Sequence, residues 1–563
     1  MGSMTVNYIV IVVAIICIIL IYFKYFEIKN KKDFIKKVKK EWGKVPSRNC
    51  SYEQLEGISR YFINKKEDEF FIDDITWNDL DMDAIFMLLN NTNSSIGEQY
   101  LYYMLRTPRF KKEELQERKR VIDYLEQNEE VRIKMQCMYG AIGRTGSYSL
   151  SDYIYNLAEL DSQSNLKHYG MLALGISSII AALTIPIYGV LIVIGVLILN
   201  ISQYYKNKSV VEPYFVSIAY INSLLVGADT FVKTMPAEFK AYTEKARELK
   251  DHFKKFKKNA KWVNAGKKAT GSVEDVLFDY IKIFFHIDLI KFNNMLADVK
   301  AKIDDINSLI ETMGCIEAYI AIASFRGTRE YYSIPELSNE KSESFILTDV
   351  YHPMIHNPVV NSMKEEKSVL ITGSNASGKS TFLKTVAINA VLAQTIYMTM
   401  SKRYSANFYR VYSSMALTDN LMSNESYYIV EIKSLKRILD ASKDETPILC
   451  FIDEVLRGTN TIERIAASAQ ILKSLNKEQV MCFAATHDIE LTHILGNVFN
   501  NYHFEEEVKD NDILFNYELR NGRATSRNAI KLLSIIGYDK EIIEEAETAA
   551  AEFTQNNSWR TLE

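Results

Sequence analysis

Hydrophobic and polar residues are segregated into long blocks along this 563-residue chain. The first block, residues 8–23, reads YIVIVVAIICIILIYF and contains no charged side chain. Its length is near the lower limit for a helix that crosses a bilayer. A cleaved signal peptide is disfavoured, because no Lys or Arg precedes the run and no small-x-small cleavage site follows it. The pattern therefore predicts an uncleaved transmembrane anchor over residues 5–24.

A basic segment follows the anchor, over residues 25–71. Between Lys24 and Arg48 there are ten Lys and Arg residues but only three acidic residues. Because Lys and Arg are enriched on the cytoplasmic side of membrane segments, we expect this side of the anchor to be cytoplasmic. The same positive charge is expected to attract anionic membrane lipids as partners. A solvated amphipathic helix is the alternative interpretation, and the two are compatible.

A second apolar block predicts a transmembrane helical hairpin over residues 169–204. Thirty-two successive residues of this block carry no charge, and as one helix they would extend about 48 Å, well beyond a hydrocarbon core of about 30 Å. Pro186 and Gly189 lie in the middle and favour a break there. Lys167 and Lys206 flank the block, so both ends are predicted to be cytoplasmic. A buried hairpin in a soluble protein is the alternative.

The remaining sequence predicts a helical part and a mixed part. Apolar spacings of three and four favour a helical core over 72–168, and a helical lever or core continues over 205–340. Eight lysines within 250–268 are typical of a solvated helix face, with a phosphate-backbone or headgroup contact as the alternative. Over 341–550 short apolar strands alternate with helices, as in an α/β nucleotide-binding domain, and 551–563 form a C-terminal tail.

Charge and cysteine content narrow the class of protein. The net charge is −4, which gives no overall basic character of the kind that nucleic-acid-binding proteins often show. The six cysteines are scattered without a Cys-x-x-Cys pair, which argues against a zinc site and a disulfide framework. This usage fits the reducing cytosol. We therefore expect a multi-pass protein of the plasma membrane whose core and nucleotide-binding domains lie on the cytoplasmic side.

A glycine-rich loop supplies the first candidate chemistry. Residues 370–381 read LITGSNASGKST, an apolar run that breaks into Gly-x-x-x-x-Gly-Lys-Ser. A strand that ends in such a loop and opens a helix turns successive backbone N–H groups toward one anion. Lys379 then reaches the outer phosphates and Ser380 holds Mg²⁺. A plain glycine turn is the alternative. The sequence predicts that a nucleoside triphosphate binds to Gly373, Ser374, Asn375, Ala376, Ser377, Gly378, Lys379, Ser380 and Thr381.

Two later apolar segments end in residues that complete a catalytic site. The segment ILCFIDE ends in Asp453 and Glu454. Asp453 is expected to complete the Mg²⁺ site begun by Ser380, and Glu454 to orient the attacking water as a general base. His487 closes the next apolar strand, in the sequence ATHD, where it is expected to sense the γ-phosphate. A capped turn is the alternative for the two acids. The predicted catalytic residues are thus Glu454, Lys379 and His487.

These motifs resemble those of a known family. GSNASGKST, FIDEVLRGTNT and ATHD, in this order and spacing, are similar to the ATPase domain of the MutS DNA mismatch-repair family. The resemblance covers about 72–130 and 310–550. It implies an α/β P-loop (ABC-type) ATPase domain preceded by an all-α core and lever domain. It also implies that ATP and Mg²⁺ lie at a homodimer interface formed by the ATPase domains. In the segment 419–432, Ser426 matches the family serine that reaches the nucleotide of the opposite subunit.

Departures from the family pattern set the functional expectation. No Phe-x-Glu module of the kind that contacts a mispair fits within the first 70 residues, and the apolar hairpin stands where the family places its DNA-gripping clamp. Ser374, Ala376 and Ser377 occupy positions where the family usually has Pro, Met and Gly. We expect a membrane-anchored MutS-like ATPase that opens and closes helical arms, with DNA and mismatch binding implied by the family alone. The alternatives are an ATP-driven transporter and a nucleotide-gated membrane scaffold that does not act on DNA.

Overall fold

The protein divides into two compact units, which are described separately. The computed structural model describes the chain except residues 1, 66–68, 147–148, 162–163, 265–280, 340–343, 375–376, 416–426, 458, 510–511, 525–529, 531–532, 534–535, 557, 560 and 562–563. Unit 1 comprises Met1–Glu67, Leu89–Tyr103 and Arg120–Thr328, and unit 2 comprises Asp68–Leu88, Met104–Lys119 and Arg329–Glu563. The segment predicted as the first part of the helical core, 72–168, is therefore shared between the two units.

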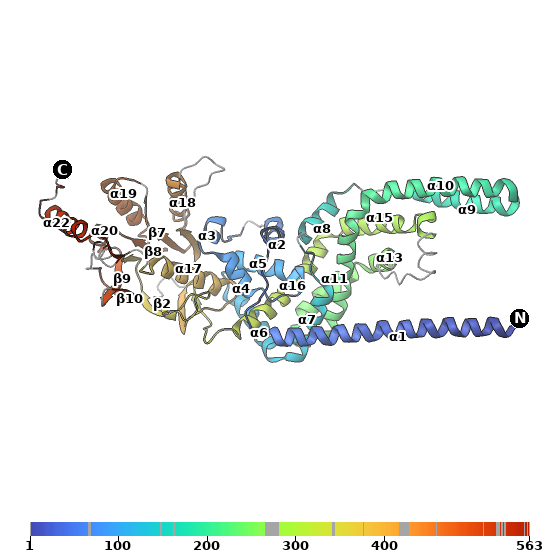
Figure 1. Ribbon diagram of the computed structural model, residues 1–563, viewed down its shortest axis with the longest axis horizontal. Helices are drawn as coiled ribbons and strands as arrows, with labels where there is room; N and C mark the ends of the chain where they lie inside the picture. Colours follow the sequence, from blue (N-terminus) through green and yellow to red (C-terminus); the bar gives the residue numbers. More distant parts are fainter. Residues whose placement is uncertain are drawn as a thin grey trace. The chain divides into compact units, whose positions relative to one another are not determined.

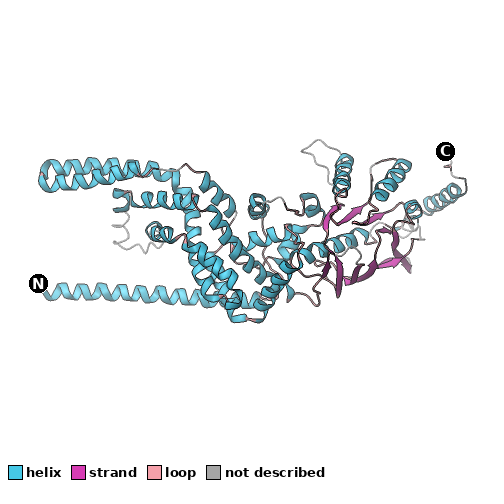
Figure 2. Cartoon of the chain, turned by 180° about the vertical axis from the view of Figure 1, so that it is seen from behind, coloured by secondary structure: helices cyan, strands magenta, loops and turns pink. Residues whose placement is uncertain are grey.

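Unit 1 is built from helices throughout its described residues (Figures 1 and 2). Three further helices run across the division between the units: α4 (Met82–Leu89), α5 (Ser95–Arg106) and α6 (Lys112–Gln127). The helices within unit 1 are α1 (Gly2–Glu41), α2 (Tyr52–Lys65), α7 (Glu129–Ile142), α8 (Leu150–Glu159), α9 (Leu166–Thr184), α10 (Pro186–Val211), η1 (Glu212–Tyr214), α11 (Phe215–Thr234), η2 (Ala237–Phe239), α12 (Lys240–Asp251), α13 (Lys254–Asn264), α15 (Ile287–Lys300) and α16 (Ile303–Arg326).

Helix α1 contains both the predicted anchor and the first part of the basic segment. Most side chains of the anchor lie outside the description, but the C-terminal half of the helix packs on α7. A Cβ atom on Gly140 of α7 would lie 2.4 Å from the ring of Phe34, so only glycine admits that ring. The guanidinium carbon of Arg132 lies 3.6 Å from the centroid of the Trp42 ring. These contacts fix the end of α1 on unit 1.

The predicted hairpin is present as α9 and α10. The first helix ends at Thr184, and Pro186 is the first residue of the second, where its fixed φ and missing N–H are tolerated. A Cβ atom on Gly189 would lie 2.3 Å from the Cα atom of Ala182, so the glycine lets the two helices approach closely. The outward face is apolar and exposed, as Leu183 (78% exposed) and Ile187 (79% exposed) show. The hairpin extends from unit 1 on the same side as the free end of α1 (Figures 1 and 2).

Three helical stretches among the described residues are long and apolar enough to cross a membrane, namely Leu166–Thr184, Pro186–Thr234 and Ile303–Arg326. The first two contain the hairpin helices, and only 17% and 22% of their most apolar windows is buried. The third is α16, whose window is 89% buried, so it is the central core helix of unit 1. At its middle, Glu317 accepts hydrogen bonds from Asn93 N (2.5 Å), Ser94 N (3.2 Å) and the Ser94 hydroxyl.

Unit 2 contains two sheets with helices packed against them (Figure 2). A four-stranded sheet has the order β1-β5-β2-β3, and a six-stranded sheet has the order β10-β9-β4-β8-β7-β6. The strands are β1 (Glu336–Ser338), β2 (Phe345–Val350), β3 (Asn361–Glu365), β4 (Val369–Thr372), β5 (Arg403–Asn407), β6 (Arg410–Ser414), β7 (Ile448–Asp453), β8 (Val480–Thr486), β9 (Asn500–Lys509) and β10 (Asp512–Asn521). The helices are α3 (Asp74–Asp79), α17 (Lys379–Thr395), α18 (Tyr427–Ala441), α19 (Thr461–Ser474), α20 (Ile489–Ile494) and α22 (Lys540–Asn556).

The centre of the six-stranded sheet is parallel and buried. Strands β9, β4, β8, β7 and β6 run in one direction, and β10 alone pairs antiparallel, with β9. All residues of β4 and β8 are buried, which agrees with continuous apolar strands covered on both faces. Because parallel strands end at one edge of a sheet, the residues that follow β4, β7 and β8 meet there.

The early segment 68–88 belongs to unit 2 because its polar side chains bond to the sheet. Asp79 Oδ2 accepts hydrogen bonds from the Ser413 hydroxyl (2.6 Å) and from Met415 N (2.9 Å). Thr76 Oγ1 accepts another from Ser413 N at 3.1 Å. Asp79 and Thr76 are both buried, so these bonds satisfy groups that have lost water.

Candidate nucleotide site

Three strand ends bring the predicted site residues together at one edge of unit 2. Thr372, the last residue of β4, pairs with Thr486, the last residue of β8. Asp453, the last residue of β7, pairs with Ala485. The phosphate loop, the acid pair and His487 therefore follow neighbouring strands. Open parallel sheets bind ligands at this edge.

The phosphate loop is shaped by two glycines with positive φ. Gly373 has φ +151° and Gly378 has φ +103°, a region that side chains other than glycine rarely adopt. Ser377 is 2% exposed, and its hydroxyl has no hydrogen-bond partner in the described part of the chain. An unpaired buried hydroxyl is costly unless a ligand takes its hydrogen bond, so the loop fits a phosphate oxygen. Asn375 and Ala376 lie outside the described residues.

Lys379 begins α17 and turns back into the loop. Its ammonium group donates to Gly373 O at 2.9 Å and Ser374 O at 2.7 Å. Burial lowers the pKa of Lys379, while the carboxylates of Asp453, Glu454 and Glu506 act in the opposite direction. A cation held among several carboxylates and backbone carbonyls is placed to bind the outer phosphates of a nucleotide. Thr381 lies exposed in the first turn of the same helix.

Ser380 and Asp453 form a pair of oxygen ligands suited to Mg²⁺. Burial raises the pKa of Asp453, and a hydrogen bond from the Ser380 side chain opposes that shift. No group of three or more His, Cys, Asp or Glu residues with metal-binding geometry occurs among the described residues. Mg²⁺ usually binds one or two protein oxygens together with phosphate oxygens and waters, so these two residues fit it without such a cluster.

Glu454 is oriented by two partners beyond the end of β7. Its Oε1 atom lies 2.6 Å from His487 Nε2, and its Oε2 atom lies 2.8 Å from Arg457 Nε. The hydrogen bond from His487 lowers the pKa of Glu454, against the opposing effect of burial. The residue has φ +56°, in the left-handed region, and its N–H donates to Ala485 O at 3.0 Å. This backbone turn directs the carboxylate differently from Asp453, one residue earlier.

A small cavity lies beside this carboxylate. Its volume is about 200 Å³, and Glu454, Arg457 and His487 are among its lining residues. Arg464 and Asp488 close part of it through a bidentate ion pair, with distances of 2.9 Å from Nε and 2.6 Å from Nη2. The cavity is large enough for ordered water next to a carboxylate that is half-buried.

Comparison with known proteins shows that the part of the chain containing this site resembles a known domain. A model of MutS domain V matches residues 369–554, which contain the whole nucleotide edge. The DNA mismatch repair protein MutS of Leptospira interrogans is 27% identical over 290 residues, covering 49% of this chain and 34% of the relative. That of Thermus thermophilus is 25% identical, covering 41% and 28%. The DNA mismatch repair protein MSH3 of Debaryomyces hansenii is 26% identical, covering 46% and 27%.

Residues 369–554 of the chain thus belong to the MutS family, as a MutS domain V. The resemblance to that family, drawn from the loop, the acid pair and ATHD, is thereby confirmed, as is a MutS-type α/β domain beside a helical region. The chain spans about a third or less of the length of these curated relatives. The α9–α10 hairpin lies outside the matched residues 369–554.

Ser426, like Asn375 and Ala376, stays a prediction without a position. Ser426 lies within 416–426, outside the described residues, and α18 begins at the next residue. In contrast, the geometry reveals two supporting residues that sequence reasoning missed. Arg457 follows Glu454 by three residues within FIDEVLRGTNT, so its spacing was a usable signal. Glu431 Oε1 accepts a hydrogen bond from Leu456 N, a contact across 25 residues that no local pattern predicts.

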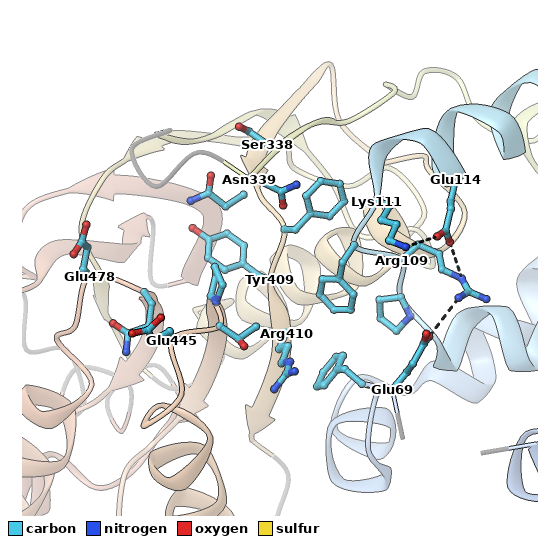
Figure 3. Close-up of a pocket in the computed structure, with 18 residues that line it drawn as sticks. Glu69, Arg109, Lys111, Glu114, Ser338, Asn339, Tyr409, Arg410, Glu445 and Glu478 are labelled. Atoms are coloured by element: carbon cyan, nitrogen blue, oxygen red, sulfur yellow. Dashed lines mark hydrogen bonds and ion pairs between the residues drawn. The ribbon is translucent and has the colours of Figure 1, made fainter. Parts of the chain in front are cut away.

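A larger cavity lies at the opposite edge of the same six-stranded sheet (Figure 3). Its volume is about 750 Å³, and its lining includes residues at or before the amino ends of β6, β7 and β8. Within its lining, Arg109 lies between Glu69 (3.5 Å) and Glu114 (3.6 Å). The lining contains no glycine-rich loop, so its size does not make it the nucleotide site.

Proposed function

We propose that this protein is a membrane-anchored ATPase that binds and hydrolyses MgATP at the nucleotide edge of unit 2. The observation that carries the proposal is the separation of two neighbouring acids into different surroundings. Asp453 bonds to Ser380, beside the phosphate loop. Glu454 is turned away and held by His487 and Arg457 beside a cavity. One acid is thus available for a metal and the other for water.

Each side chain has a distinct part in hydrolysis. Ser380 and Asp453 would hold Mg²⁺, and the bound ion would supply positive charge to the phosphate oxygens. Lys379 and the loop N–H groups bind and orient the triphosphate. Glu454 orients a water molecule toward the γ-phosphorus and accepts its proton as the new P–O bond forms and the bond to the leaving ADP breaks. His487, hydrogen-bonded to Glu454, fixes the direction of that carboxylate.

We propose further that two copies of the chain sandwich the nucleotides. The family resemblance assigns Ser426 to contact the γ-phosphate of the partner subunit. Such a contact would exist only while the triphosphate is intact, so ATP would favour the closed dimer and hydrolysis would release it. The helical arms of unit 1 would then open and close with turnover.

The membrane part of the proposal rests on the hairpin. Its exposed apolar residues are too many for an ordinary water-facing surface, and its flanks are basic. Insertion of α9 and α10, together with the anchor in α1, would place the two units on the cytoplasmic side of the plasma membrane. Anionic lipids are the expected partners of the basic flanks.

We propose DNA as a partner only on the basis of sequence similarity to relatives. The relatives are named DNA mismatch repair proteins, but this chain covers only part of their length. A salt-titrated binding assay with paired, mispaired and branched DNA tests the proposal. Tighter binding to mispaired DNA supports a mismatch-related role. Equal affinity for all three kinds of DNA refutes the mismatch-related role.

The enzymatic proposal is tested by phosphate release from purified full-length protein. We expect release of phosphate from ATP in Mg²⁺ and none in EDTA. A mixture of Lys379→Ala and Ser426→Ala chains tests the shared site, because each mixed dimer retains one intact composite site. Recovery of about half of the wild-type activity per mixed dimer supports action across the interface. No recovery, with dimers present, refutes the role of Ser426 in the partner's site.

A further inference from the structure

A cavity in unit 1 has the composition of an anion-binding site. It has a volume of about 520 Å³ and lies where the end of α1 meets the residues that precede α5. Its lining contains five cationic side chains and a run of amide residues before α5. The cationic residues are Lys37, Lys40, Lys44, Arg48 and Arg144.

The positive charge of this cavity is only partly compensated. Arg48 and Arg144 both pair with the buried carboxylate of Glu98, at 2.6 Å and 3.3 Å. The three lysines have no ion-pair partner within the residues that the structure describes. Glu41 is the one acidic residue in the described lining. Lys37 and Lys40, three residues apart, lie on one face of α1, and Lys44 follows the turn after the helix ends at Glu41.

A buried amide adds an unused hydrogen-bond donor. Asn90 lines the cavity and is 2% exposed. Its Oδ1 atom accepts a hydrogen bond from the Thr92 hydroxyl at 2.7 Å, whereas its Nδ2 group has no partner in the described part of the chain. Leaving a buried N–H donor unpaired is unfavourable, and a ligand oxygen would satisfy it.

The cavity walls are held in place by contacts on both sides. Gly43, with φ +66°, turns the chain after α1, and its N–H donates to the Ser324 hydroxyl at 3.1 Å. The Trp42 ring stacks on Arg132, and Phe34 fills the space above Gly140. On the other side, Asn91 Nδ2 donates to the same Ser324 hydroxyl at 2.8 Å. The lysines therefore project from a fixed helix end.

We propose that this cavity binds a small phosphate-bearing molecule that carries two or more negative charges. Several cations converging with a neutral donor match phosphate oxygens better than a single carboxylate. The volume lies within the range of small-molecule pockets, about 300–1,000 Å³, which admits a molecule of nucleotide size. The site is in unit 1 and is separate from the nucleotide edge of unit 2.

The position of the cavity favours a soluble ligand over a lipid headgroup. This step rests on the proposed insertion of α1. Lys37 lies fourteen residues beyond Phe23, the end of the apolar run, which is about 21 Å along one continuous helix. A tilt of up to about 40° would still leave about 16 Å. Headgroups extend only about 5–8 Å beyond the hydrocarbon core, so they would not reach the lysines.

Binding of tripolyphosphate to the full-length protein in detergent tests the proposal. The protein carries Lys379→Ala, so that the phosphate loop does not compete and failure of the ATPase proposal does not affect the result. Calorimetric titration should show saturable binding. Lys40→Ala with Lys44→Ala should weaken it by about tenfold or more. Lys39→Ala is the matched control, because Lys39 pairs with Glu129 at 3.0 Å and does not line the cavity; its affinity should be unchanged.

A second variant and a lipid analysis complete the design. Asn90→Asp, with the fold checked by circular dichroism, should also abolish binding, because it sets a carboxylate against the anion. The proposal is overturned if the protein that carries Lys379→Ala alone does not bind tripolyphosphate. It is also overturned if the Lys40→Ala, Lys44→Ala double variant and the Lys39→Ala control bind it with equal affinity. If tripolyphosphate does not bind, and purified wild-type protein retains anionic lipid that the double variant lacks, the cavity is a lipid site and the soluble assignment is wrong.

Discussion

The nucleotide edge of unit 2 and the α9–α10 hairpin of unit 1 depart from ordinary protein solvation in opposite directions. At the edge, polar groups are buried: Lys379 is 5% exposed and Ser377 2%. In the hairpin, apolar groups are exposed, with Leu183 and Ile187 more than three-quarters accessible. Burial of polar groups and exposure of apolar ones both cost free energy in water. Under the proposed function, each region would be stabilised by something outside the polypeptide: an anion at the nucleotide edge and the lipid bilayer at the hairpin.

The largest effect is expected at the edge, from Glu454→Gln. Loss of the general base should lower the rate of ATP hydrolysis by about 10²–10⁴-fold, while ATP remains bound. Single-turnover phosphate release and nucleotide binding measure the two properties separately. Glu463→Gln, in the first turn of α19, is the control. Normal turnover by Glu454→Gln would show that the base has been assigned to the wrong residue.

The hairpin gives the next largest effect. Ile194→Lys places a charge at a 48% exposed position near the middle of the apolar stretch. In a bilayer this should cost about 2.5–3.5 kcal/mol, whereas on a water-facing surface it should change stability by about 0.5 kcal/mol or less. Carbonate extraction and thermal unfolding in lipid report the difference. Tyr205→Lys, on the basic flank of the same helix, should leave both unchanged. Equal behaviour of the two variants would argue for a hairpin that lies in water.

Lys379→Ala tests whether the buried cation of the edge is there for a ligand. Removing a charge-assisted contact should raise the Kd for MgATP by about 100-fold. A fluorescent ATP analogue measures this change. Lys384→Ala is the matched control on the same helix, since Lys384 pairs with Asp81 at 2.7 Å. Unaltered affinity in Lys379→Ala would remove the phosphate loop from nucleotide binding.

The smallest effect concerns Glu317, a buried carboxylate of unit 1 whose hydrogen-bond donors are neutral. Burial raises the pKa of Glu317 to about 7, from an ordinary value of 4.5. The folded state therefore binds the proton more tightly than the unfolded state, and stability is greatest below pH 4.5 and falls as pH rises through 7. Between pH 5 and pH 7 we expect a loss of about 2 kcal/mol.

Glu317→Gln should remove this pH dependence, because the amide does not titrate. Urea unfolding monitored on unit 1 across this pH range measures it. Glu311→Gln, on the same helix, is the control, since Glu311 is partly exposed and pairs with Lys65 at 2.8 Å. The same slope in Glu317→Gln and in the wild type would show that another group is responsible.

Local patterns predicted the features that depend on local chemistry. Pro186 predicted the helix break, and the glycine-rich loop predicted where β4 gives way to α17. The predicted site residues that the structure describes lie at one edge, because parallel strands end together. The roles of those residues, the domain boundaries and the position of Ser426 stay predictions.

Contacts between distant segments could not be predicted in the same way. Asp73 and Arg437 form an ion pair across more than 360 residues, and Glu317 reaches Asn93 across 224. A polar residue in an amphipathic helix has the same local signature whether it faces solvent or a buried donor. Only the folded chain distinguishes the two, which is why part of the early helical segment was not expected beside the sheet.

The hairpin turn has a consequence for how the protein would communicate across a membrane. A single residue, Ile185, separates α9 from α10, and Gly189 seats one helix directly on the other. With the hairpin inserted as proposed, an extracellular molecule would meet no polar loop between these helices. Movement of the helical arms of unit 1 would instead tilt α9 and α10 together as one stiff body. The hairpin would then transmit a conformational change from the cell interior to the lipid, and not a signal from outside to the interior.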